Sequence, residues 1–272
     1  MPFCTVNKAN IYYEIIGTGT PIVMLHGYSP DHQLMKGCME PVFAEIEGWK
    51  RIYIDLPGMG KTSNYEKINN SDEMLEAVIE LIHSLIPNER YLLVGESYGG
   101  YLVRGIMREH HEQILGAAFI CPLIIPDKES RTVPPQSIVS ADKEFLSTLT
   151  KQELEDFSSH LVVLDEENCH RYTNEVLAGI KNADVEFLEK IQESYRFSFP
   201  VDEISFAKPS LFLLGKQDSI VGYKDAFAIL DKFPRAAFTI LDKAGHNLQI
   251  EQAGLFNSLM HEWLDRVQEF ND

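Results

Sequence analysis

The sequence predicts an α/β fold, with a mostly parallel central sheet and helices on both of its faces. Short runs of apolar and β-branched residues alternate with segments whose apolar residues recur at helical spacing. One long segment breaks this alternation, and we interpret it as a helical insertion. A chain of 272 residues is long enough for one large α/β domain with such an insertion, or for two modest domains.

The strands are predicted from the short apolar runs. Residues 3–7 and 10–16 are expected to pair as a hairpin, with Lys8 and Ala9 at its turn. Further strands are expected at 22–25, 51–54, 91–95, 117–120, 211–214 and 237–241. Their alternation with helices is what favours a parallel sheet.

Helices are predicted where apolar residues return to one face. Residues 72–86 place Leu75, Val78 and Ile82 on one side, and Ser71 stands where an N-cap is expected. Further helices are expected at 98–110, 223–233 and about 252–269.

From about Leu123 to Lys208 the sequence shows no convincing strand, and prolines mark both ends of this segment. We therefore divide the chain into a core, residues 1–122 and 209–272, and a helical cap, residues 123–208. A lid over a site in the core is the functional interpretation, and an inert helical appendage is the alternative. Within the cap, helices are expected at 141–149, 151–160, 165–181 and 184–194.

Seven apolar residues of the cap have two possible roles. They could line a pocket for a ligand, or they could simply pack the cap on the core. These residues are Leu123, Ile124, Ile125, Phe145, Leu149, Phe197 and Phe199.

Composition narrows the class of partner and the compartment. Asp and Glu number 41 against 24 Lys and Arg, and the formal net charge of −17 argues against nucleic acid or an anionic membrane as partner. No signal peptide is visible, and no apolar stretch approaches the roughly 20 residues of a membrane span. The cysteines at positions 4, 38, 121 and 169 form no C-x-x-C pair. We expect a cytoplasmic protein with reduced thiols.

The segment Gly95-Glu96-Ser97-Tyr98-Gly99 places a serine where a strand is expected to turn abruptly into a helix. Small residues on both sides of it allow a tight, strained turn that exposes the Ser97 side chain. A serine presented in this way suits nucleophilic attack on a carbonyl carbon. Because the G-x-S-x-G pattern is short, the hypothesis depends on finding a base, an acid and an oxyanion site.

His246 and Asp218 supply the base and the acid. His246 follows the last predicted strand, and Asp218 follows the strand before it. Loops at the carboxyl ends of parallel strands line the ligand crevice of an open α/β sheet. The chain order Ser, Asp, His is the one expected after a nucleophile elbow. Asp127 and Asp225 also lie near strand ends, and they are the alternative carboxylates.

These residue types match the chemistry of acyl transfer. A serine hydroxyl needs a base to accept its proton, and an imidazole of near-neutral pKa suits this role. A carboxylate then holds the imidazole tautomer. The oxyanion requires donors, for which we predict the backbone N–H groups of Tyr98 and Tyr28. His26, directly before Gly27, is expected to shape the loop that carries Tyr28.

One competing motif is rejected. Gly58-Met59-Gly60-Lys61-Thr62 resembles the end of a phosphate-binding P-loop. The first glycine of that motif would fall at position 55, which is Asp55. A glycine-rich turn that closes a strand is the better interpretation.

Together these segments resemble the α/β-hydrolase superfamily over nearly the whole chain, and the insertion resembles its cap. The resemblance implies the α/β-hydrolase fold and a serine nucleophile. The matching segments are His26-Gly27-Tyr28, Asp55–Gly60, Gly95–Gly100, Gly215–Asp218 and Gly245-His246.

The expected activity is that of a serine hydrolase, with a carboxylesterase acting on a small-molecule ester as the first choice. Within the superfamily the chain is also similar to hydrolases of carbon–carbon bonds in ring-cleavage products and to prolyl aminopeptidases. A non-enzymatic ligand sensor with slow turnover is a further alternative. No metal or organic cofactor is implied. The sequence leaves the acyl and alcohol groups and the oligomeric state, monomer or homodimer, open.

Overall fold

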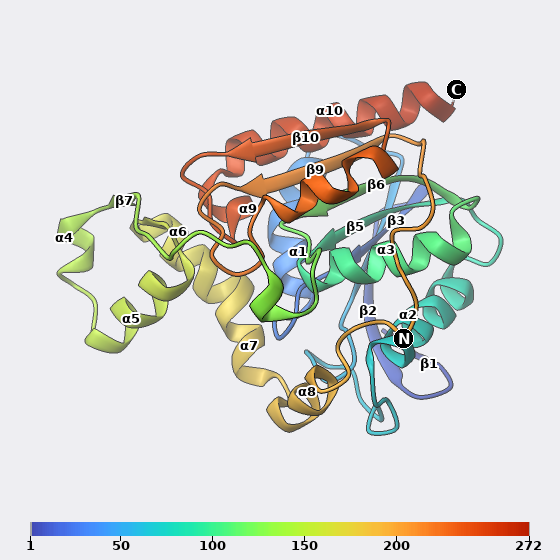
Figure 1. Cartoon of the computed structure of the whole chain (residues 1–272), viewed down its shortest axis with the longest axis horizontal. Helices are drawn as coiled ribbons and strands as arrows, with labels where there is room; N and C mark the ends of the chain where they lie inside the picture. The colour runs from blue at the N-terminus through green and yellow to red at the C-terminus, as the bar shows by residue number, and fades with distance from the viewer. Residues whose placement is uncertain (1, 272) are drawn as a thin grey trace.

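A computed structural model describes residues 2–271, whose main element is an eight-stranded sheet in the order β1-β2-β4-β3-β5-β6-β9-β10 (Figure 1). The first two pairings are antiparallel and all others are parallel. The prediction of a mostly parallel sheet is therefore confirmed. The strands are β1 Phe3–Thr5, β2 Asn10–Ile16, β3 Thr20–Leu25, β4 Trp49–Ile54, β5 Tyr91–Glu96, β6 Ile114–Ile120, β9 Ser210–Gly215 and β10 Ala236–Leu241.

The crevice of this sheet lies between β3 and β5. From β3 the chain moves to β4 on one side, and it later returns to form β5 on the other side. The loops after β3 and β5 therefore diverge, which is the arrangement that opens a ligand site in α/β sheets. All residues of β5, β6 and β9 are buried, so the centre of the sheet is covered on both faces.

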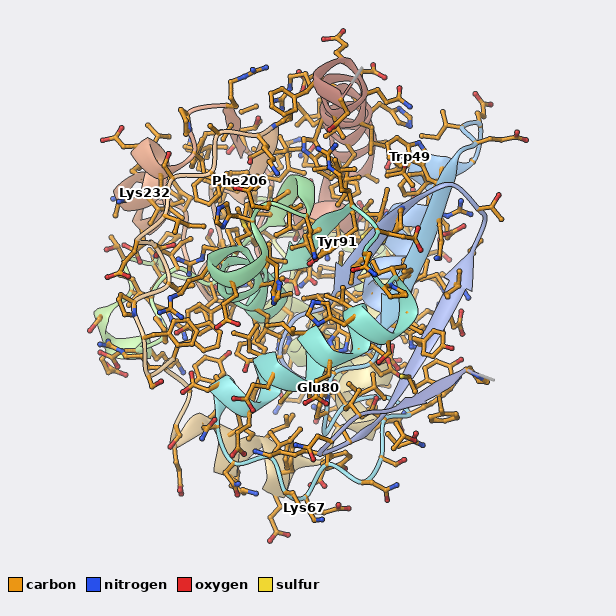
Figure 2. The ribbon with its side chains drawn as sticks, turned by 90° about the vertical axis from the view of Figure 1, so that its right-hand side faces the viewer. Trp49, Lys67, Glu80, Tyr91, Phe206 and Lys232 are labelled. Carbon is orange, nitrogen blue, oxygen red and sulfur yellow. The ribbon has the colours of Figure 1, made fainter. Side chains whose placement is uncertain are left out.

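Helices cover both faces of the sheet, as predicted (Figure 1). α3 (Tyr98–His110) packs on β3, β5 and β6, and α2 (Ser71–Leu85) packs against α3. On the other face, α1 (His32–Met39) packs on β3 and β4, and α10 (Ala253–Asn271) packs on β6 and β9. The side view shows α2 with Glu80, which accepts a hydrogen bond from the Asn7 N–H at 2.8 Å and so holds the hairpin (Figure 2).

The segment between β6 and β9 carries the expected helices and two short strands. α4 and α5 lie furthest from the sheet, and α6 to α8 run back along it (Figure 1). The division into core and cap stays a prediction. The elements are η2 Lys128–Ser130, β7 Ser140–Ala141, α4 Lys143–Leu146, α5 Lys151–His160, β8 Val163–Leu164, α6 Glu166–Tyr172, the π-helical turn η3 Thr173–Leu177, α7 Ala178–Asn182 and α8 Val185–Gln192.

Several expectations about local structure were wrong. Asn70, not Ser71, caps α2 by accepting from the Glu73 N–H at 2.9 Å. Ser71 is buried and instead accepts a hydrogen bond from the Tyr98 hydroxyl at 2.8 Å. The helix expected at 223–233 is the 3-10 helix η4, Asp225–Lys232. The segment expected to lack strands contains β7 and β8, which pair with each other.

Besides η2, the described residues contain three short helices that were not predicted. They are α1 His32–Met39, the 3-10 turn η1 Glu40–Phe43 and α9 Leu248–Glu251.

Arg104 ties both ends of the predicted cap to α3. Its side chain is buried, donates to the carbonyl oxygens of Leu123 and Ile124 at 2.7 and 3.1 Å, and pairs with Asp202. Leu123 and Ile124 begin the segment, and Asp202 lies near its end. One buried guanidinium therefore joins the core to the chain on both sides of the insertion.

We expect Arg104→Met to lower the free energy of unfolding by about 2–4 kcal/mol, because it leaves two buried carbonyl oxygens and Asp202 without their donor. Urea denaturation measures this loss. Arg108→Met, one turn along α3, removes a partly exposed pair with Glu109 and a contact with the Phe199 ring, whose centroid lies 4.4 Å from Arg108 Cζ. Both contacts are partly exposed, so the change should cost about 1 kcal/mol or less. Equal losses in the two variants would contradict the assigned role of Arg104.

Candidate active site

The turn from β5 to α3 holds Ser97 at φ 50° and ψ −114°, which is left-handed backbone that side chains rarely adopt. Its backbone N–H donates to Ile120 at 3.0 Å, and its carbonyl oxygen accepts from the Leu123 N–H at 2.9 Å. A Cβ on Gly99 would lie 2.2 Å from the Leu25 carbonyl oxygen, so only glycine lets α3 begin so close to β3. The sequence motif therefore forms the predicted strand-to-helix turn.

The structure brings the three predicted side chains together. Ser97 Oγ lies 3.0 Å from His246 Nε2, and His246 Nδ1 lies 2.9 Å from Asp218 Oδ2. Neither alternative carboxylate takes this place. Asp127 is exposed and bonded to the Ser130 hydroxyl, and Asp225 accepts from the Thr132 N–H at 2.9 Å.

Asp218 is fully buried, and its contacts favour the charged form. Its second oxygen accepts from the N–H groups of Ile220 and Val221 at 2.9 and 3.0 Å. Burial opposes ionisation, but these bonds and the adjacent imidazole keep the pKa of Asp218 below its usual value. In return, although burial acts against it, the Asp218 carboxylate raises the pKa of His246 above that of an ordinary histidine.

A buried carboxylate from α9 fixes the loop that carries His246. Glu251 accepts from the Gly245 N–H and from the Val162 N–H, both at 2.6 Å. Burial raises the pKa of Glu251 to about 7. Asn247 adds a bond to the His160 carbonyl oxygen at 3.0 Å. The histidine loop is thus bonded directly to the segment that joins α5 and β8.

The predicted oxyanion donors lie on two segments next to Ser97: the start of α3 and the loop after β3. Tyr98 is the first residue of α3, and the first N–H groups of a helix have no partner within it. A Cβ on Gly27 would lie 3.2 Å from the Ser97 Cβ, which places the loop before Tyr28 directly over the serine. Tyr28 is held by its hydroxyl, which donates to the Leu188 carbonyl oxygen at 2.5 Å.

Glu96 is a site residue that the sequence reasoning missed. Its buried carboxylate lies 3.3 Å from His246 Nε2, on the side of the ring that faces Ser97. Burial raises the pKa of Glu96. The only sequence signal is an acidic residue inside an otherwise small and apolar motif, because its orientation depends on the turn itself.

A cavity of about 740 Å³ opens over Ser97 and His246. Of the seven apolar cap residues considered from the sequence, Leu123 lines it. Phe197 instead stacks between Tyr101 and Phe199, with ring centroids 4.1 and 4.9 Å apart, and so packs the insertion on α3. The cavity wall also includes three tyrosines, Tyr28, Tyr172 and Tyr195.

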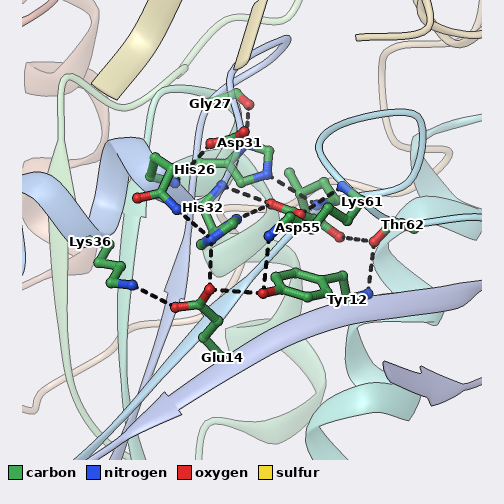
Figure 3. Close-up of polar contacts among 12 residues, drawn as sticks. Tyr12, Glu14, His26, Gly27, Asp31, His32, Lys36, Asp55, Lys61 and Thr62 are labelled. Carbon is green, nitrogen blue, oxygen red and sulfur yellow. Dashed lines mark hydrogen bonds and ion pairs between the residues drawn. The ribbon is translucent and has the colours of Figure 1, made fainter. Parts of the chain in front are cut away.

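A second histidine–carboxylate cluster supports the loop after β3 (Figure 3). His26 Nε2 accepts from the Leu56 N–H at 3.0 Å, so Nδ1 donates to the Gly27 carbonyl oxygen at 2.7 Å, and His26 shapes the loop as expected. His32 Nδ1 lies 2.7 Å from Asp55 Oδ1. Asp55 also accepts from the Lys61 N–H at 2.8 Å, which closes the glycine-rich turn that resembles a P-loop.

Two groups of side chains have metal-ligand spacing: Cys121 with Asp218 and His246, and Asp31 with His32 and Asp55. Their atoms are already engaged. The Asp218–His246 pair is internally bonded, Asp55 accepts from both His32 and Lys61, and Asp31 caps α1. We assign these groups to hydrogen bonding rather than to a metal site. Within residues 2–271 no helix has both the length and the apolar character that a membrane crossing requires.

Comparisons with known proteins cover almost the whole chain. The family model described as serine aminopeptidase, S33, matches residues 20–253. The crystal structure of an alpha/beta superfamily hydrolase from Oenococcus oeni PSU-1 is 31% identical, with a TM-score of 0.91, over 98% of this chain and 100% of that chain. A monoacylglycerol lipase of Xenopus laevis is 23% identical over 93% of this chain and 77% of its own length. A pimeloyl-acyl-carrier-protein methyl ester esterase of Legionella pneumophila (strain Corby) is 23% identical over 94% and 99%.

We expect Gly99→Ala to lower the free energy of unfolding by about 1–3 kcal/mol, because the new methyl group must displace the Leu25 backbone or the start of α3. Gly254→Ala is the matched control, since a Cβ there meets no atom within 4 Å. It should leave stability unchanged or raise it by up to about 1 kcal/mol. If urea unfolding shows no difference between the variants, the turn is not as tightly packed as described.

Proposed function

The chain belongs to the serine aminopeptidase S33 family of α/β hydrolases, and we propose that it is a carboxylesterase that hydrolyses small-molecule esters through Ser97, His246 and Asp218. The observation that carries this proposal is the pair of contacts at 3.0 and 2.9 Å that links the three side chains in order. The names of the curated relatives, an ester hydrolase and a lipase, support ester substrates.

In the acylation step, Ser97 Oγ forms a bond to the ester carbonyl carbon while His246 Nε2 accepts the serine proton. The N–H groups of Tyr28 and Tyr98 stabilise the oxyanion. The tetrahedral intermediate then collapses, and the alcohol leaves with the proton from His246. Asp218 holds the Nδ1–H tautomer throughout and stabilises the imidazolium.

In the deacylation step, His246 takes a proton from water, and the resulting hydroxide attacks the acyl carbon. The bond between the acyl group and Ser97 breaks, the serine regains its proton from His246, and the carboxylic acid is released. Net consumption is one ester and one water, and the enzyme returns to its starting state.

One feature of the cavity, the charge of Arg131, bears on the alternatives. A prolyl aminopeptidase-like activity would bring an ammonium group close to the half-buried, unpaired charge of Arg131, and like charges repel. The carboxylates that also line the cavity are the exposed Asp127 and Glu193, and Glu96, which faces His246. Hydrolysis of carbon–carbon bonds could use the same serine and histidine, so a substrate panel must separate it from ester hydrolysis. A ligand sensor would bind tightly with almost no turnover.

We expect Ser97→Ala to lower kcat for a short-chain ester at least about 10⁴-fold, because no other group supplies the nucleophile. The melting temperature should stay within a few degrees of that of the wild type. Asp127→Asn, which removes a carboxylate that lines the cavity outside the triad, should keep near wild-type kcat. Undiminished turnover by Ser97→Ala would overturn the proposed function.

The pH profile of kcat/KM should reveal Glu96. His246 must be neutral to accept a proton, so activity falls as the pH drops through its pKa, which Asp218 and Glu96 raise and Arg131 lowers. Glu96→Gln removes one negative charge, so we expect the acidic limb to move to lower pH. Asp127→Asn should leave it in place. An acidic limb that does not move in Glu96→Gln would show that Glu96 is uncharged or does not act on His246.

A further inference from the structure

Arg131 differs from the other buried or half-buried arginines of this protein because it has no ion-pair partner within the described residues. The chain has nine arginines, of which Arg90, Arg196 and Arg235 are exposed and the other six are buried or half-buried. Five of these six form an ion pair with an aspartate or glutamate, and Arg131 alone forms none within residues 2–271. The paired arginines are Arg51, Arg104, Arg108, Arg171 and Arg266.

The unpaired guanidinium lies in the wall of the cavity that contains Ser97 and His246. Leaving a charge partly buried without a counter-ion is unfavourable, and arginine does not relieve this by losing its proton. Burial lowers the pKa of Arg131. The positive charge of Arg131 in turn lowers the pKa of His246, so Arg131 acts electrostatically on the catalytic base. Asp218, Asp127 and Asp225 attract the guanidinium from a distance, but none of them forms an ion pair with it within the described residues. A counter-ion in direct contact is therefore expected to come from outside the chain.

Three backbone carbonyl groups fix the orientation of this guanidinium. Nε donates to Ile125 at 2.9 Å, Nη2 to Pro126 at 2.9 Å and Nη1 to Ile220 at 3.2 Å. Ile220 also donates its N–H to the triad residue Asp218, so Arg131 is anchored to the triad loop. Each terminal nitrogen carries a second N–H, and this fork geometry matches a carboxylate.

The other charges of the cavity are consistent with an anionic ligand. Lys128 and Arg196 also line it, and both are exposed and form no ion pair within the described residues. Of its carboxylates, Glu96 faces His246, Asp127 is exposed and bonded to Ser130, and Glu193 is exposed. Arg131 is thus the fixed, half-buried charge of the cavity that remains free to pair with a ligand, and it is positive.

We propose that Arg131 is a specificity residue that binds a carboxylate on the substrate, so that the preferred esters carry a free carboxylate besides the ester group. This proposal rests on the proposed ester hydrolysis and deepens it. Candidates by chemistry are monoesters of dicarboxylic acids, with the charge on the acyl part, and esters of hydroxy acids, with the charge on the alcohol part.

Two matched substrate pairs test the proposal, with release of acid followed in a pH-stat. Monomethyl adipate against methyl hexanoate exchanges a terminal carboxylate for a methyl group on the acyl part. The acetate ester of γ-hydroxybutyrate against butyl acetate makes the same exchange on the alcohol part. In at least one pair, wild-type kcat/KM should be about tenfold or more higher for the charged member, and the pair that responds identifies the part that Arg131 binds.

Arg131→Met should lower the ratio of kcat/KM for the charged member to kcat/KM for the neutral member by about 10- to 100-fold, the range expected for a charged hydrogen-bonded pair. The ratio is the readout because Arg131 also contacts the triad loop and lowers the pKa of His246, and these effects act on both members alike. Arg131→Lys should retain part of the preference, and Arg90→Met, which removes an exposed charge outside the cavity, should retain all of it. No preference in the wild type, or equal losses on both members of a pair, would overturn the proposal.

One measurement avoids any folding defect of the variants. Adipate should inhibit wild-type hydrolysis of methyl hexanoate competitively and at least about tenfold better than its neutral diamide; equal inhibition overturns the carboxylate subsite. If the wild type hydrolyses none of the four esters, the proposed ester hydrolysis fails. Calorimetric binding of adipate that weakens in Arg131→Met would then still support the anion site, and undetectable binding would overturn it too.

Discussion

The backbone of Ser97 occupies a region of φ and ψ that costs a side-chain-bearing residue on the order of 1–3 kcal/mol. The strain persists because the N–H and C=O of Ser97 are both bonded to the chain at the end of β6, and because Gly99 allows α3 to begin against β3. The hydroxyl thereby points into the crevice where the loops after β3, β5, β9 and β10 converge. The roles assigned to His246, Asp218 and the Tyr28 and Tyr98 N–H groups all depend on this turn, because each is defined by its position relative to Ser97.

The electrostatics of the site differ from those of the whole chain. A net charge of −17 repels anions at low ionic strength, but exposed charges more than about 8–10 Å away are largely screened at physiological ionic strength. The buried Asp218 and the cavity-lining Glu96 both face the imidazole of His246, whereas Arg131 in the cavity wall forms no ion pair within the described residues. Local arrangement therefore decides which ligands the site favours, and overall charge does not.

The sequence predicts the sheet and the three clustered side chains well for the same reason. Strands are short and rich in apolar residues, and Ser97, Asp218 and His246 lie within five residues of the ends of β5, β9 and β10, so strand order alone brings them to one edge. Features that depend on tertiary packing were not predicted. The sequence predicts Ser71 as the N-cap of α2, but Asn70 takes this role and the Ser71 hydroxyl is bonded to Tyr98 instead. The direction of the Glu96 side chain is set by the backbone of the turn, which the sequence does not show. Whether Arg131 has an ion-pair partner depends on where all the surrounding side chains lie, so it can be known only from the structure.

Labelling with a fluorophosphonate probe tests the central claim most directly, because the probe needs an activated serine and an oxyanion site together but no knowledge of the substrate. Mass spectrometry of the digested protein should show one phosphonyl group per chain, on the peptide that contains Ser97, and Ser97→Ala should remain unlabelled. A protein that hydrolyses esters while Ser97 stays unmodified, or that carries the label on another residue, would contradict the account.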